Sequence, residues 1–375
     1  MMQQKQADIA IIGAGIVGLA MAYHLVQQGK SVVVFERNSR ALGASFRNFG
    51  LVWTIGQPPG RIYERALYGR SVWKDIAAKT GLRCLETGSL HLAYHDDEAA
   101  VIEEFAQTEG IHCSMLTAAQ TADKSKAYKQ QGLKAALWSP MEMMLDPRQA
   151  SATIASWLEE QHAVSFRFNT AVNGISMPFI ETPTEKWTVG QVYVCAGADF
   201  ETLYPKAFAE APLTKCKLQM LRTVPQPGNW QLGPALSTGL SMVYYASFAH
   251  CKSLSALKQR INESFPEYQK YGVHLLVSQN GAGELSLGDS HEYGHTVDPF
   301  DKEHINQMIL QYLPNFLQAP TLDIQERWHG VYPKLTNGEH DLVLHPEKGV
   351  TIVNGLGGAG MTLSFGLAKE LTAQL

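Results

Sequence analysis

Three glycines near the N-terminus have the spacing of a phosphate-binding turn. Gly13, Gly15 and Gly18 form a GxGxxG pattern between two apolar runs. Such glycines allow a tight turn, let a pyrophosphate approach the backbone, and bring the following helix close to the preceding strand. The free N–H groups where that helix starts, at Ile16 and Val17, would face the phosphates. The pattern therefore predicts a dinucleotide-binding site.

A carboxylate at the end of the next predicted strand supports this site. Glu36 follows Ser31–Phe35, an uncharged and β-branched run that is typical of a buried strand. It stands roughly 20 residues after the glycines, where a carboxylate can hold the ribose hydroxyls. The alternative is a glycine turn in an ordinary α/β protein. The strand, the turn, the helix and Glu36 together favour the nucleotide.

Two further turns favour FAD over NAD, because the glycine pattern alone does not decide between them. Val192–Gly197 is an apolar strand that ends in a turn of small residues, which suits close approach by a cofactor. Asn354–Met361 is a second Gly-rich turn between a strand and a helix. Reduced flavin carries negative charge, which the N–H groups at a helix N-terminus could stabilise. We therefore expect FAD.

The elements around these turns indicate an α/β (α+β) chain of 375 residues with about two domains. Helices are expected at Ile16–Gln28 and Met361–Gln374, and strand-like runs dominate residues 212–299. Leu240–Phe248 is one such run, and a strand there would point Tyr244 and Tyr245 to opposite faces. The layout predicts two interleaved domains, a βαβ FAD-binding domain (1–88, 146–211 and 325–375) and a mostly antiparallel β-sheet substrate domain (89–145 and 212–324).

Several segments, taken in order, resemble the D-amino-acid oxidase superfamily of flavoenzymes, especially its glycine oxidase and sarcosine oxidase-like members. They are DIAIIGAGIVGLAMAYHL with VVVFER, LGASFRNFG, VYVCAGAD, ERWHGVYPKLTNGEHDLV and NGLGGAGMTLSFGLAKEL. They span nearly the whole chain and are specific together. The resemblance implies a two-domain flavoprotein in which a βαβ FAD domain interleaves with a mostly antiparallel substrate domain, in agreement with the layout.

The resemblance also implies roles for residues along the cofactor. The glycines of the first turn would face the pyrophosphate, Glu36 would face the adenosine ribose with Arg37 beside it, and Val172 would meet the adenine side through its backbone. The residues implied to lie along or to cap the flavin are Ala44, Ser45, Arg47, Asn48, Ala196, Gly197, Gly357, Gly358, Ala359, Gly360, Met361 and Thr362.

The implied reaction is oxidation of the C–N bond of a small primary or secondary amine, such as an amino acid, an N-methyl amino acid or an aminophosphonate. A hydride would pass to flavin N5, and water would hydrolyse the resulting imine. Orientation and desolvation of the amine would supply much of the catalysis, while the flavin carries the electrons. The alternatives are an NAD(P)-dependent dehydrogenase and a non-catalytic flavin-binding subunit of a complex.

At one position the sequence departs from these relatives. Glycine oxidase-like enzymes hold the substrate carboxylate with an arginine in a G-x-R-P segment, whereas Gly330–Pro333 reads GVYP. Tyr332 can donate one hydrogen bond but cannot form a bidentate charged clamp. A simple α-amino acid bound in the usual way is therefore not expected. The basic residues that could hold an anion instead are Arg47, Arg222, Arg327, His329 and Lys334.

The catalytic candidates are Arg47, Asn48, His291, Tyr332 and Lys334. GASFRNFG together with GDSHEYG resembles a subgroup of these oxidases that is linked to aminophosphonate breakdown. A phosphonate-bearing or N-substituted amine would suit a site without the carboxylate-binding arginine.

His291 begins an HExxH pattern, His291–His295. In zinc proteases both histidines stand on one face of a helix. Gly288, Gly294 and the Asp298–Pro299 pair are instead typical of a strand end and a turn. We expect no metal here and place His291 in the wall of the substrate cavity.

The flavin is expected to be held non-covalently. Sarcosine oxidases attach it to a cysteine near the GVYP segment, but no cysteine follows Cys251. Their oxygen-activating lysine would lie on Gly283–Asp289, which contains no lysine. The electron acceptor is therefore oxygen or an unknown carrier.

Composition excludes several other classes of protein. Hydrophobic residues make up 45%, charged residues 18%, and the net charge is −4, so no basic field would recruit nucleic acid or anionic lipid. Five cysteines without a CxxC pair are typical of a reducing compartment. The uncharged run Ile9–Gly29 is explained by a strand, a turn and a helix rather than a membrane span, and MMQQKQ lacks the basic start of a signal peptide. We expect a cytoplasmic protein with a small amine substrate.

Overall fold

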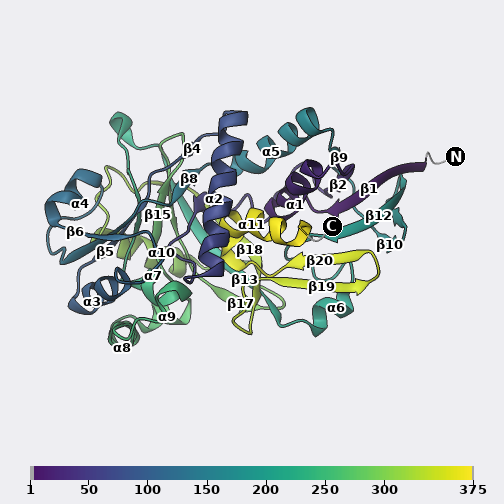
Figure 1. Ribbon diagram of the computed structural model, residues 1–375. Coiled ribbons are helices and arrows are strands. Elements are labelled where there is room, and N and C mark those ends of the chain that lie inside the picture. Colours follow the sequence, from purple (N-terminus) through teal and green to yellow (C-terminus); the bar gives the residue numbers. More distant parts are fainter. Residues whose placement is uncertain (1–3, 374–375) are drawn as a thin grey trace.

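The computed structural model describes residues 4–373, and its strands form two large sheets and one small sheet (Figure 1). In Figure 1 the eight-stranded sheet lies to the right, beside the N-terminus, and much of the nine-stranded sheet lies to the left. Helix α2 (Arg61–Thr80) stands between them, next to α11 (Gly360–Thr372). Residues 1–3 of the predicted first domain and Gln374 of the predicted last helix lie outside the described residues.

The eight-stranded sheet is built around the βαβ unit that the glycine pattern predicts. Strand β1 (Gln4–Ile12) pairs in parallel with β2 (Val32–Phe35) and with β12 (Lys186–Val194), and α1 (Ile16–Gln27) connects β1 to β2. The predicted βαβ unit is confirmed. The other strands of this sheet are β9 (Ser165–Arg167), β10 (Gly174–Ser176), β11 (Phe179–Glu181), β19 (Leu342–Glu347) and β20 (Val350–Asn354).

The nine-stranded sheet is mostly antiparallel. Its longest pair is β13 (Leu213–Thr223) with β18 (Ile324–Leu335), while β5 (Ser89–Ala93) and β14 (Ala235–Ser237) pair in parallel. The remaining strands are β6 (Ser114–Leu116), β7 (Ala135–Ser139), β15 (Leu276–Gln279), β16 (Leu285–Gly288) and β17 (Glu292–Gly294). Strands β3 (Leu51–Val52), β4 (Cys84–Leu85) and β8 (Met143–Leu145) form the small sheet.

The chain passes between the two large sheets more than once, as the interleaved layout expects. Strand β18 pairs with β13 along its length, although residues 325–375 are predicted to belong to the FAD-binding domain. By its hydrogen bonds this strand is part of the nine-stranded sheet. The division into domains stays a prediction.

The segment Leu240–Phe248 is helical, so the strand predicted there is wrong. Helix α7 (Gly239–Tyr244) is followed by a 3₁₀ turn, Ala246–Phe248. A short apolar run shows no reliable period, so its sequence cannot separate a buried strand from a buried helix. Gly239 lets the start of α7 approach the buried Glu98, where a Cβ would lie 2.6 Å from the carboxyl carbon. Tyr244 and Tyr245 therefore do not alternate across a strand.

Helices α5 and α11 pack against α1, the helix of the βαβ unit, and also against α2. Helix α1 is apolar and buried over most of its length, as a helix inside a core must be. The other helices are α3 (Asp96–Phe105), α4 (Ala118–Lys124), α5 (Pro147–His162), α6 (Pro205–Glu210), α8 (Leu254–Ser264), α9 (Pro266–Lys270) and α10 (Glu303–Tyr312). Within residues 4–373, none of the helices is long and apolar enough to cross a membrane.

Candidate active site

The first glycine turn leaves no room for side chains. Gly13 has φ +105°, and a Cβ on it would lie 2.5 Å from the Cys195 carbonyl oxygen. A Cβ on Gly18 would collide with the Gly13 carbonyl, which lets α1 start close against β1. The Ile16 N–H at the start of α1 donates to Ser45 Oγ over 2.9 Å. The turn therefore presents bare backbone, as a bound pyrophosphate requires.

Glu36 holds the edge of this turn in place. It follows β2 and is 9% exposed, and its Oε2 accepts a hydrogen bond of 3.2 Å from the Ala14 N–H. Its Oε1 accepts from the Asn38 backbone and side chain over 3.0 and 3.1 Å. Arg37 points elsewhere, toward Asp199 at 2.8 Å. A fixed carboxylate beside the glycine turn suits ribose hydroxyls.

A cavity of about 1140 Å³ runs from this turn into the nine-stranded sheet. This exceeds the roughly 300–1,000 Å³ of common small-ligand sites and suits a dinucleotide together with a substrate. The cavity is lined by the predicted cofactor residues Gly13, Gly15, Ile16, Val17, Glu36, Arg37, Ala44, Ser45, Arg47, Asn48, Val172, Ala196, Gly197, Gly357, Gly358, Ala359, Gly360, Met361 and Thr362. Gly18 is the exception, since it packs behind the turn. Their contacts with the cofactor stay a prediction.

The second glycine turn lines the same cavity. Strand β20 is followed by a 3₁₀ turn, Gly357–Ala359, and then by α11. A Cβ on Gly358 would lie 3.6 Å from the Tyr332 hydroxyl, and one on Gly357 would lie 3.5 Å from Lys334 Cδ. The N-terminus of α11 therefore faces the cavity next to two of the catalytic candidates. Such an N-terminus can stabilise negative charge on a reduced flavin ring.

Two phenols line the cavity beside the second glycine turn. Tyr332 is 4% exposed, and its hydroxyl lies 3.3 Å from that of Tyr244, from the end of α7. Burial raises the pKa of both phenols well above 10. Both therefore stay protonated at neutral pH. Since one hydroxyl donates to the other, one O–H of the pair is left to donate to a ligand in the cavity.

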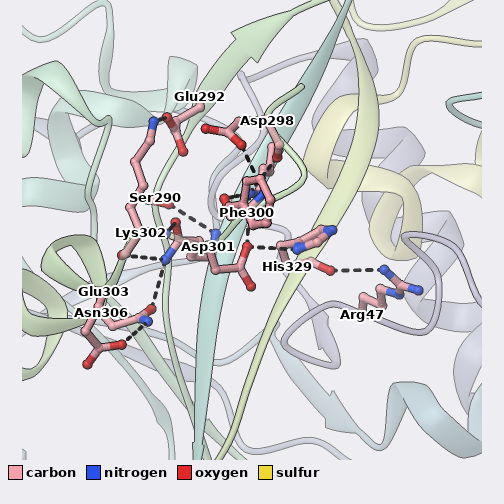
Figure 2. Close-up of polar contacts among 12 residues, drawn as sticks. Arg47, Ser290, Glu292, Asp298, Phe300, Asp301, Lys302, Glu303, Asn306 and His329 are labelled. Atoms are coloured by element: carbon pink, nitrogen blue, oxygen red, sulfur yellow. Dashed lines mark hydrogen bonds and ion pairs between the residues drawn. The ribbon is translucent and has the colours of Figure 1, made fainter. Parts of the chain in front are cut away.

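All five catalytic candidates line the main cavity, but three of the other basic residues do not. Arg222, Arg327 and His329 line a second hollow of about 420 Å³, which Arg47 also reaches. His329 already has polar partners there (Figure 2). Its Nδ1 lies 2.8 Å from Asp301 Oδ1, and its carbonyl oxygen accepts a hydrogen bond of 3.3 Å from Arg47. Lys334 is half-buried, and its ammonium has no ion-pair partner among residues 4–373. Lys334 and Arg47 are thus the candidates left for an anionic substrate group.

His291 lies in a polar cluster that the sequence does not reveal. His274 Nε2 lies 3.1 Å from Asp289 Oδ1, and His291 Nε2 lies 3.8 Å from Asp289 Oδ2. Burial lowers the pKa of His274 and of His291, the latter to about 4, and raises the pKa of Asp289 well above its usual value. His274 stands on a different segment, so no spacing links it to GDSH. Tyr244 and Tyr245 both line the cavity, rather than pointing to opposite faces of a strand.

The HExxH pattern does not form a zinc-protease helix. Glu292–Gly294 is strand β17, and His295 is exposed while His291 is buried. Glu292 forms an ion pair with Lys302 (Figure 2). The expectation of strand-end geometry here is confirmed.

A comparison with known protein families identifies the family of this chain. The family model DAO, described as FAD dependent oxidoreductase, matches residues 8–374. The chain belongs to this DAO family. The predicted cofactor, FAD rather than NAD, is therefore confirmed, and this DAO-family protein is an FAD-dependent enzyme.

Two curated relatives of this DAO-family chain align over most of its length. Glycine oxidase of Bacillus licheniformis is 20% identical over 92% of this chain and 86% of its own, and monomeric sarcosine oxidase of Bacillus sp. (strain NS-129) is 22% identical over 98% and 92%. A match to the mouse pyruvate dehydrogenase phosphatase regulatory subunit, 23% identical, covers 44% of this chain and 20% of that protein. The crystal structure of glycine oxidase from Geobacillus kaustophilus has a TM-score of 0.77 at 18% identity, covering 99% of this chain and 94% of its own, which shows the same fold.

Proposed function

We propose that this enzyme oxidises the C–N bond of a small primary or secondary amine. The anionic group of this amine would not be bound by an arginine at the position of Tyr332. An N-substituted aminophosphonate is the substrate class we favour. The observation that carries the proposal is buried Tyr332, which stands where the resemblance to glycine oxidases expects an arginine. Relatives named glycine oxidase and sarcosine oxidase support an amine as the substrate.

Residues around Tyr332 suit a substrate of this kind. FAD supplies the ring that accepts two electrons from the carbon next to nitrogen. The hydrogen-bonded pair of Tyr332 and Tyr244 would donate one hydrogen bond that orients the substrate, because their raised pKa values keep both phenols protonated. Lys334 offers one unpaired positive charge beside the glycine turn, which suits a compact anion better than a planar clamp. The acceptor that reoxidises the flavin is proposed to be oxygen or another carrier.

Tyr332→Arg tests the proposal directly. An arginine here restores a bidentate clamp worth roughly 1.5–3 kcal/mol for a carboxylate, so kcat/KM for glycine is expected to rise at least about tenfold. Turnover of an N-methylated aminophosphonate is expected to fall. Phe300→Arg is the control, because Phe300 is an aromatic residue that is 77% exposed and does not line the cavity. The proposal fails if the wild-type enzyme already oxidises glycine as well as Tyr332→Arg does.

A further inference from the structure

Three buried side chains in the wall of the main cavity lie close together. His274, Asp289 and His291 are 3–4% exposed, and one nitrogen or oxygen of each lies within 4.8 Å of the others. All three line the main cavity. None of the three belongs to either glycine turn, and none is among the predicted cofactor residues.

The hydrogen bonds behind the cluster fix which ring nitrogens face inward. His291 Nδ1 lies 2.9 Å from the Gly272 carbonyl oxygen, so it must carry the hydrogen and donate. His274 Nδ1 lies 3.3 Å from Ser241 Oγ, whose own hydrogen goes to the Leu275 carbonyl. Both Nε2 atoms are therefore left as lone pairs. Outer hydrogen bonds of this kind orient histidines that bind metals.

The space between the three side chains is then lined by acceptors. Both Nε2 lone pairs face the Asp289 carboxylate, and Asp289 Oδ1 accepts no hydrogen bond from the described residues. Buried lone pairs that face one another are stabilised only when a positive species lies between them. The cluster is therefore completed either by a proton on Asp289, which would donate to one Nε2, or by a metal ion bound to all three side chains.

The ring geometry fits a metal ion. The two imidazole rings are 5.0 Å apart and only 11° from parallel, and the Tyr244 ring lies 4.1 Å from one and 4.3 Å from the other. The two imidazole rings therefore lie side by side beneath the ring of Tyr244. In this arrangement both Nε2 atoms can bind one ion that lies close to the plane of both rings. An ion roughly 2.0–2.2 Å from each ligand sets ligand atoms about 3–4 Å apart. The distances of 3.1 and 3.8 Å to Asp289 fall in this range.

We propose that His274, Asp289 and His291 bind one divalent transition-metal ion of the Zn²⁺ or Fe²⁺ type. Two imidazoles and one carboxylate are ligands that such ions accept, and three protein ligands leave a coordination position open. That position would face the cavity and take an anionic oxygen of the substrate, a step that rests on the proposed function. The site shares only His291 with the HExxH pattern, so it is not the zinc-protease arrangement.

Metal content of the FAD-loaded protein tests the site. The protein is incubated with one equivalent of Zn²⁺, desalted into metal-free buffer, and analysed by inductively coupled plasma mass spectrometry. About one Zn²⁺ per chain is expected for the wild type, and less than about a tenth for Asp289→Asn and His274→Gln. His91→Gln is the matched control, because His91 is buried in the same sheet but outside the cluster, and it should keep the metal.

X-ray absorption at the zinc edge gives a second readout that needs no variant. It should show nitrogen and oxygen neighbours at about 2.0–2.2 Å, including imidazole. The proposal is overturned if the wild type holds no Zn²⁺, if Asp289→Asn binds as much as the wild type, or if the neighbours include sulfur. A loaded protein whose flavin no amine reduces would contradict the proposed function alone. Amine oxidation by a protein that cannot bind Zn²⁺ would overturn the metal site alone.

Discussion

Most of the polar side chains discussed at this site are buried, including Glu36, Tyr332 and His291. Glu36 and the glycines could be predicted from sequence, because each acts on neighbours a few residues away or at a fixed offset. Tyr332 could be found because a known pattern breaks there. His274 and Asp289 could not be paired, since the sheet brings them together from separate segments. Local spacing thus predicts the glycine turn with Glu36 beside it, and it does not predict the cluster of His274 with Asp289.

His24 gives a test at the residue scale. Its Nε2 lies 3.0 Å from the Phe365 carbonyl oxygen, and burial lowers its pKa to about 4. The unfolded chain binds a proton at His24 below its ordinary pKa near 6.5, whereas the folded chain does so only near pH 4. Acid therefore favours unfolding between pH 6.5 and 4. His24→Gln keeps an N–H donor but removes this proton.

The measurement for His24 is urea unfolding of both proteins at pH 7.5, 6 and 5. The stability of His24→Gln relative to wild type is expected to rise by about 1.4 kcal/mol per pH unit below 6.5. A difference that stays constant over this range would show that His24 is not buried in its neutral form.

Helices α2 and α11 are in close contact, and α11 directly follows the second glycine turn. A Cβ on Gly69 would collide with the Thr362 carbonyl, and one on Gly366 would lie 2.6 Å from the Arg65 carbonyl. Thr362 in turn accepts a hydrogen bond of 2.8 Å from the Trp53 N–H. Element types near the glycine turns could be predicted from sequence, whereas α7 could not, because its helical form depends on packing against other elements.

Gly69→Ala tests the element scale. The added methyl group forces α2 away from α11, so we expect a loss of about 1–3 kcal/mol in the free energy of unfolding and weaker FAD retention. Gly174→Ala is the control, because a Cβ there meets nothing within 4 Å. Denaturant unfolding and the flavin content after gel filtration measure both effects. Equal stability of the two variants would contradict the close packing of these helices.

At the scale of the whole molecule, the cavity is lined by elements of both large sheets. Gly13 and Val172 come from the side of the eight-stranded sheet, and Tyr332 and His291 from the nine-stranded sheet. A ligand that fills this space binds the folded chain alone and stabilises it by mass action. The interleaved order of the segments could be predicted from sequence. The sheet membership of β18 could not, because strand pairing over long separations leaves no local signal.

FAD is therefore expected to raise the melting temperature of the flavin-free protein. At 100 times its dissociation constant the stabilisation is about 2.7 kcal/mol, which corresponds to a few degrees. Differential scanning calorimetry with FAD or with NAD at equal concentration measures this. NAD is the control, and an equal shift with NAD would contradict the FAD assignment of the site.

Anaerobic reduction of the bound flavin tests the central claim most directly. The wild-type holoprotein is mixed without oxygen with an N-methylated aminophosphonate, with sarcosine, with glycine or with buffer, and absorbance near ~450 nm is followed, where oxidised flavin absorbs. The account predicts that the aminophosphonate bleaches the flavin and that glycine does so far more slowly. Bleaching by glycine alone, or by none of the amines, would contradict it.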